Sequence, residues 1–272
     1  MIYDFEVTRI QTVLALVVLL PCAAAAAEPA ALARARALYN SGSYDAAIDA
    51  ATSARIDPKA EDAAALVLAR AHLERFRSGG AAADLNAART ALGVVRMTAL
   101  SARDQLDLLI GLGQTLYFGE SYGSAADVFD SALGRATTLG ARDRAKLLDW
   151  WATALDRQAQ ARTLDRRVPA FSRVVERMED ELRLDPGSVI ANYWLVVAAR
   201  GAGDLDRAWD AAVAGWVRAA LGSDAAGLRA ELDRVVADAL IPERTRQRPP
   251  REQAEAAAAM RAEWEKVKAD WK

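Results

Sequence analysis

A short motif recurs three times where one helix-patterned segment gives way to the next. The copies are GSYDAAI at 42–48, ESYGSAA at 120–126 and GDLDRAW at 203–209. Each copy marks the bend of a helical hairpin. Hairpins that recur along a chain are typical of repeat arrays, in which each unit packs on its neighbours. This feature constrains the fold more than any other in the 272-residue chain.

The rest of the chain is also patterned for helices. Alanine, the strongest helix former, is abundant, and no alternating β pattern of useful length occurs. Breaks at proline and glycine divide the chain into twelve expected helices. Their expected bounds are 30–40, 44–55, 61–76, 82–95, 101–118, 122–138, 141–161, 168–184, 189–200, 205–221, 224–240 and 251–272. The sequence therefore predicts an all-α fold with short connections.

Composition excludes several classes of function. The formal net charge is −2 and no basic stripe occurs, which argues against a nucleic-acid partner. Cys22 is the only cysteine and His72 the only histidine, so disulfide frameworks and Cys/His metal sites are excluded. We expect His72 to have no partner of its own. No catalytic, cofactor-binding or metal-binding residue is expected.

The N-terminus has the pattern of an export leader. An apolar run extends from Val13 to Ala27 and ends in alanines, as a signal peptide does before its cleavage site. Cleavage would leave residues 28–272 in the periplasm or outside the cell, with no stable membrane span. Two membrane-anchored alternatives remain, an uncleaved leader and lipidation of Cys22. Pro21 precedes that cysteine where a lipidation motif has a small residue, so simple cleavage is favoured.

The hairpins resemble tetratricopeptide repeats, whose pattern is W-x2-L-G-x2-Y, A-x3-F and P over about 34 residues. The copy most like this pattern is Leu109-x2-Leu112-Gly113-x2-Leu116 followed by Ala125-x3-Phe129 and Ala132. The first copy keeps Ala35, Leu38, Gly42, Tyr44, Ala47, Ala51, Ala54 and Pro58 but has Arg34 where the large aliphatic belongs. The last keeps Leu195, Gly203, Leu205 and Ala208, with Val196 at the small position. Segments 61–95 and 141–184 have no clear signature, so the repeats are degenerate and lengthened.

The resemblance implies a right-handed superhelical array of hairpins over residues 28–240. A Pro/Arg-rich linker, 241–250, and a C-terminal amphipathic helix, 251–272, would follow. Ligands in this family usually lie against the first helix of each hairpin. The positions that the resemblance places on this groove are Arg36, Tyr39, Asn40, Asp107, Ile110, Gln114, Tyr117 and Phe118. The alternative for Tyr117 and Phe118 is packing against a neighbouring hairpin.

The C-terminal helix carries one apolar seam. Its members are spaced 3-4-3-4, which places them on one helical face: Ala257, Met260, Trp264, Val267 and Trp271. Terminal repeats need a cap with a polar outer face, because an uncovered hairpin exposes apolar surface. We therefore expect this helix to dock, either on the last hairpin as a cap or on a partner, with capping favoured.

Other conspicuous residues favour structural interpretations. The carboxylates of residues 176–181 are expected to form a solvated face, neutralised locally by Arg173, Arg177 and Arg183. The tryptophans at 150, 151, 194, 209 and 216 are expected to pack in the core or between repeats, the alternative being an aromatic platform for a peptide or glycan.

These features favour an exported tetratricopeptide-type scaffold that binds a protein or peptide partner in the bacterial envelope, and not an enzyme. The alternatives are a structural envelope component, or an accessory or lytic enzyme that uses Asp/Glu chemistry. Oligomeric state does not follow from the sequence.

If the leader is cleaved, the exported protein begins near Glu28. Mass spectrometry of the intact protein from its native host should give that N-terminus, because the apolar run ends at Ala27. A cytosolic species that keeps Met1 or Ile2 would contradict this prediction.

Overall fold

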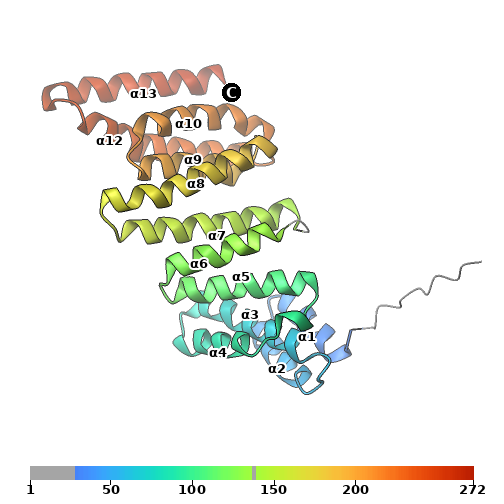
Figure 1. Cartoon of the computed structure of the whole chain (residues 1–272). Coiled ribbons are helices and arrows are strands. Elements are labelled where there is room, and N and C mark those ends of the chain that lie inside the picture. The colour runs from blue at the N-terminus through green and yellow to red at the C-terminus, as the bar shows by residue number, and fades with distance from the viewer. Residues whose placement is uncertain (1–27, 137–138) are drawn as a thin grey trace, which may run out of the picture.

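The computed structural model describes residues 28–136 and 139–272 (Figure 1). The expected leader, 1–27, lies outside the described residues. Throughout the described part the chain is helical and contains no strand, as the sequence predicts.

Six α-helices form the first half of the described chain. They are α1 (Ala30–Asn40), α2 (Tyr44–Ala54), α3 (Glu61–Gly79), α4 (Ala82–Gly93), α5 (Ala102–Phe118) and α6 (Tyr122–Gly134), with a 3-10 turn at Met97–Ala99. Ser101 caps α5, since its hydroxyl accepts from the Asp104 amide at 3.2 Å. Helix α6 ends before the expected residue 138.

The second half contains seven labelled α-helices. They are α7 (Ala141–Gln160), α8 (Leu164–Leu184), α9 (Val189–Gly201), α10 (Leu205–Arg218), α11 (Ala225–Val235), α12 (Ile241–Arg246) and α13 (Gln253–Asp270). A π-helical segment, Val236–Leu240, joins α11 to α12 without a break. If α11, the π-helical segment and α12 are counted as one continuous helix, the described residues contain twelve helices, the number that the sequence predicts.

Two further boundaries differ from the expected ones, and both lie near prolines. Helix α8 begins at Leu164, four residues before the expected Val168, and contains Pro169. The expected linker 241–250 begins with α12, so the non-helical junction before the turn Pro250–Glu252 is only residues 247–249. The π-helical turn directly before Pro242 is wider than an α-helical turn. It leaves room for the proline ring, which would clash with a backbone carbonyl of a preceding α-helical turn.

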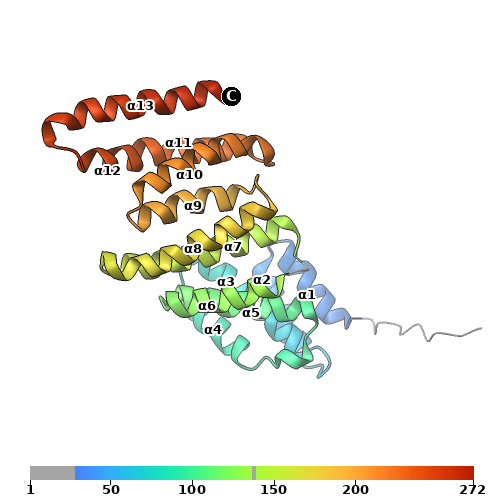
Figure 2. The same cartoon turned by 45° about the horizontal axis from the view of Figure 1, so that its top comes forward.

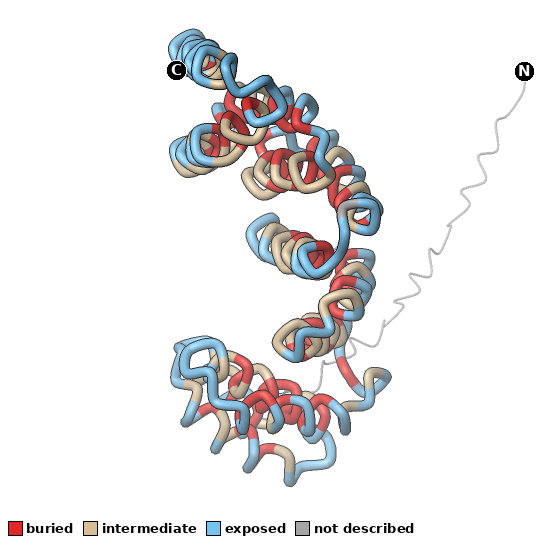
Figure 3. Tube along the Cα trace, turned by 90° about the vertical axis from the view of Figure 1, so that its left-hand side faces the viewer, coloured by how far each residue is buried: buried red, intermediate tan, exposed pale blue. Residues whose placement is uncertain are grey.

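The helices stack in chain order. Each packs chiefly on its sequence neighbours, and the odd-numbered helices also contact one another in the pairs α1–α3, α3–α5, α7–α9 and α9–α11. Figures 1 and 2 show the stack running from α1–α4 at one end to α13 at the other. Viewed from the side, the chain bends into an arc with its buried residues between the helices (Figure 3).

The three recurrent turns have the same backbone geometry. The φ angle is left-handed in each, at 77° for Gly42, 60° for Glu120 and 84° for Gly203. The amide of this residue donates to the carbonyl three residues earlier, and the next amide to the carbonyl five residues earlier, at N···O distances of 2.9–3.0 Å. These bonds form a Schellman motif that ends one helix directly before the next begins. The repetition seen in the sequence is therefore a repetition of structure.

Small residues permit a close crossing of α5 and α6. A Cβ added to Gly113 would lie 2.4 Å from the Phe129 ring, so α5 and α6 approach here only because glycine has no side chain. Ala125, also on α6, is fully buried. Gly113, the small residue of the copy most like a tetratricopeptide repeat, thus lies at the contact between the two helices of its hairpin.

The buried residues form two apolar cores. One includes Leu66, Leu73 and Leu108 and lies among α1–α5. The other includes Leu106, Phe129 and Trp264 and extends from α5 to α13. Because Leu106 and Leu108 belong to different cores, α5 is the helix that both cores share.

The middle turn is strained, which predicts an asymmetric response to substitution. Glu120 adopts a left-handed conformation that disfavours residues with a Cβ, so Glu120→Gly should raise the free energy of unfolding by about 1 kcal/mol. Gly42→Ala and Gly203→Ala, the matched controls, should lower it by a similar amount. Urea unfolding of the three variants measures this. A destabilised Glu120→Gly would show that the turn is held by the glutamate side chain.

Candidate functional site

A groove of ≈ 520 Å³ crosses the odd-numbered helices from α1 to α7. Its lining comes from α1, α3, α5 and α7, together with Leu139 before α7. These are the first helices of successive hairpins. Both cores contribute to it, since Tyr39 packs on the first core and Leu147 belongs to the second.

The structure brings half of the predicted groove residues together. The four that line the groove are Tyr39, Asp107, Ile110 and Gln114. Tyr39 is at the end of α1, and the other three follow one face of α5 at spacings of three and four residues. Their convergence depends on the contacts of α3 with both α1 and α5.

The other four predicted residues lie outside the lining. Arg36 pairs with Asp104 at 3.0 Å, and Asn40 is exposed. Tyr117 and Phe118 belong to an aromatic cluster whose other members are Phe76, Tyr122, Phe129 and Trp150, with ring centroids 5.0–5.9 Å apart. This is the packing against neighbouring helices that the sequence left open.

Two helices of the groove were not anticipated. Helix α3 contributes Arg70, Glu74 and Arg77, and α7 contributes Asp143, Lys146, Asp149 and Trp150, among others. Arg103 of α5 was also missed. The available signal was helical spacing, because residues 70, 74 and 77 share one face. Without a repeat signature in these segments, nothing in the sequence showed which face would turn to the groove.

Ion pairs join the walls of the groove. Asp107 is buried and accepts from Arg70 of α3 at 2.7 Å, with Arg103 at 3.5 Å. Lys146 and Asp143 pair within α7 at 3.5 Å. These five charged side chains of the groove therefore have partners within the groove itself.

Tyr39 and Trp150 bring aromatic surface to the groove. The Arg70 guanidinium lies 4.5 Å from the centre of the Tyr39 ring, and that of Arg77 lies 5.9 Å from the Trp150 ring. Burial raises the pKa of the Tyr39 phenol, although Arg70 opposes this shift. The phenol therefore stays protonated at neutral pH and can donate a hydrogen bond.

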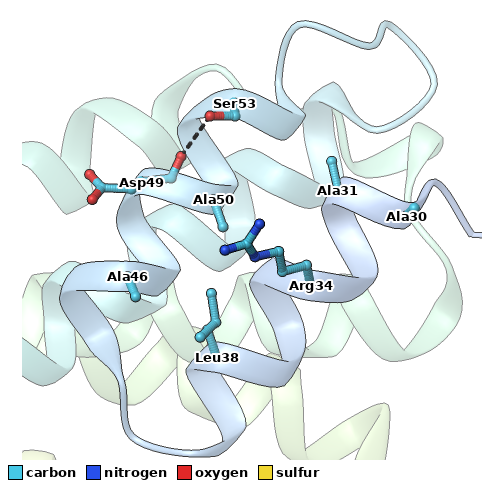
Figure 4. Close-up of a pocket in the computed structure, with 8 residues that line it drawn as sticks. All are labelled: Ala30, Ala31, Arg34, Leu38, Ala46, Asp49, Ala50 and Ser53. Carbon is cyan, nitrogen blue, oxygen red and sulfur yellow. Dashed lines mark hydrogen bonds between the residues drawn. The ribbon is translucent and has the colours of Figure 1, made fainter.

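A second cavity, of ≈ 500 Å³, lies between α1 and α2 (Figure 4). Half of its lining residues are alanines, and the others are Arg34, Leu38, Asp49 and Ser53. The Ser53 hydroxyl donates to the Asp49 carbonyl at 3.0 Å, as serine does within helices. We assign no ligand to this cavity.

Several other side chains have partners that correct the sequence interpretation. His72 is within 2.7 Å of Asp84 on α4, so the prediction that it has no partner is wrong. Arg173 and Arg177 pair with Asp127 and Asp130 of α6, whereas Arg183 pairs with Asp180 of its own helix, as predicted. Of the five tryptophans expected to pack, four are buried, and Trp150 is half-buried at the groove.

The seam of α13 faces the last helices of the stack. Trp264 is buried at 2% exposure and packs edge-on against Trp209 and Trp216 of α10. Ala257, Met260 and Val267 pack against the same core. Trp271 is the exception. The residue is 54% exposed, and its backbone carbonyl accepts from the Trp216 indole at 2.9 Å and from Arg229 at 3.1 Å.

Asp233 of α11 anchors this helix. It accepts from the Trp264 indole at 2.7 Å and from Lys268 at 3.0 Å. Burial alone would raise the pKa of Asp233, but these hydrogen bonds outweigh it and hold the pKa below its ordinary value. This stabilisation is therefore complete above pH of about 4 and is lost as the pH falls through the lowered pKa.

Comparison of the chain with protein-family models, curated proteins and solved structures gives no match. Within residues 28–136 and 139–272 no helix has the length and apolarity needed to span a membrane. The same residues contain no group of three or more His, Cys, Asp or Glu side chains placed to hold a metal ion.

The docked helix predicts different effects of two tryptophan substitutions. Trp264→Ala should destabilise the protein by about 3–5 kcal/mol because it empties a buried site, whereas Trp271→Ala, the control, should cost far less. Thermal melts of both variants, and of a chain ending at Arg248, test this. An unchanged melt for Trp264→Ala and for the shortened chain would show that α13 is not a cap.

Proposed function

We propose that this protein is an exported tetratricopeptide-type scaffold whose groove across α1, α3, α5 and α7 binds an extended segment of a protein partner. The helices would form a right-handed solenoid, and the groove would lie on its concave face. The observation that carries the proposal is the lining itself, which comes from the first helices of successive hairpins.

Two further observations support a repeat scaffold. The turns at Gly42, Glu120 and Gly203 share their backbone geometry and hydrogen bonds. The Gly113 crossing occurs where the resemblance places a small residue. Export to the periplasm or beyond rests on the leader pattern alone, and in that compartment the partner would be an envelope protein.

The carboxylates of the groove favour binding over catalysis. Asp107 is buried and already pairs with Arg70 and Arg103, so its carboxylate is engaged within the chain and is not presented to a substrate. Helix α13 packs against α10 and α12, which are not among the helices that line the groove. A structural role in which the groove holds the chain's own C-terminal helix is therefore disfavoured.

Capture from envelope extract tests the proposal. The immobilised wild-type protein should retain a partner that the Ile110→Glu variant loses, because a charge in the groove disrupts an apolar contact. Ile56→Glu is the matched control, since Ile56 is 84% exposed and outside the groove. Circular dichroism melts verify that both variants are folded. Equal capture by all three proteins would contradict binding in the groove.

A further inference from the structure

We propose, resting on the function proposed above, that the groove selects an uncharged peptide segment carrying one large apolar side chain. An acidic or basic segment would bind less well. The charges, the apolar surface and the hydrogen-bonding groups of the groove each support this choice of ligand.

The charges that line the groove balance. Four are basic, Arg70, Arg77, Arg103 and Lys146, and four are acidic, Glu74, Asp107, Asp143 and Asp149. Their sum is zero, so the groove offers no net field to steer a charged segment toward it. Selection by opposite charge, which needs an excess of one sign, is absent from this lining.

Every one of these eight side chains already has a polar partner in the chain. Besides the pairs of Asp107 and Asp143, Arg77 pairs with Glu74 at 2.9 Å, and Asp149 accepts from the Trp194 indole at 2.8 Å. An acidic ligand would have to compete with Asp107 for Arg70 or Arg103. Because Asp107 is only 6% exposed, losing either arginine would leave a buried carboxylate undercompensated. The exposed ion pairs of the groove are weaker, but a ligand that replaces one of them gains little binding free energy.

Part of the groove lining is apolar. The large apolar residues in it are Ile110 of α5, Leu139, and Leu147 and Trp150 of α7. A large aliphatic or aromatic side chain placed there would bury apolar surface against Trp150 without breaking an ion pair. The volume of ≈ 520 Å³ is within the range of small-ligand sites and suits a short stretch of peptide.

The remaining polar groups suit a peptide backbone. The Gln114 side chain has both a donor and an acceptor, and the Tyr39 phenol can donate. Neutral groups of this kind match the amide and carbonyl groups of an extended chain. Together with the apolar residues of the lining, these groups allow the groove to hold a segment that carries no charge.

Selection from a phage-displayed library of short random peptides tests this ligand class. The purified wild-type protein should enrich peptides of near-zero net charge that contain a large apolar residue. The most enriched sequence, synthesised with blocked ends, should bind with an affinity that changes less than about twofold between about 0.05 M and 0.5 M NaCl. Fluorescence anisotropy of the labelled peptide measures this.

The groove variants give the outcomes that decide the question. Ile110→Glu should weaken binding of the neutral peptide at least about tenfold, which is about 1.4 kcal/mol, while Ile56→Glu should leave it unchanged. Gln114→Arg replaces Ile110→Glu if the latter fails to fold. Enrichment of charged peptides that lose affinity in salt and on Ile110→Glu would overturn the proposed ligand class but support groove binding. Enrichment of no peptide that depends on the groove would overturn both.

Discussion

The approach of α5 to α6 at Gly113 is the constraint on which the rest of the structure depends. A Cβ there would lie 2.4 Å from the Phe129 ring, so the two helices hold this distance only with glycine at the crossing. Adding atoms to such a packed contact forces side chains or backbone to move. Since α5 belongs to both apolar cores, a shift at this crossing would be transmitted to each.

Helix α5 also holds the first hairpins through two buried carboxylates. Asp104 pairs with Arg36 of α1, and Asp107 pairs with Arg70 of α3, on successive turns of α5. Buried ion pairs contribute little net stability because desolvation offsets their attraction, but losing one partner is costly. Here the two pairs fix which face of α1 and of α3 turns toward α5. Tyr39 and Glu74 thereby reach the same groove as Ile110.

The sequence predicts local structure well, because helices and turns depend on nearby residues. The three recurrent turns and the crossing at Gly113 lie where the motif places them. Local rules fail where tertiary contacts decide, as in α8, which continues through Pro169, and at His72, whose partner comes from another helix. For the same reason, only four of the eight residues that the sequence predicts for the groove line it. Residues on α5 followed from the motif, whereas Arg70 on α3 and Trp150 on α7 required the packing of helices that have no repeat signature.

The position of the groove connects binding to stability. Its lining comes from both cores, and these cores share α5. A ligand that contacts both Tyr39 and Trp150 would therefore add contacts between the parts of the stack that contain the two cores. Binding to the folded state alone raises stability in proportion to the logarithm of ligand concentration. Occupation of this groove should thus oppose the separation of the two cores, because the groove and both cores share α5.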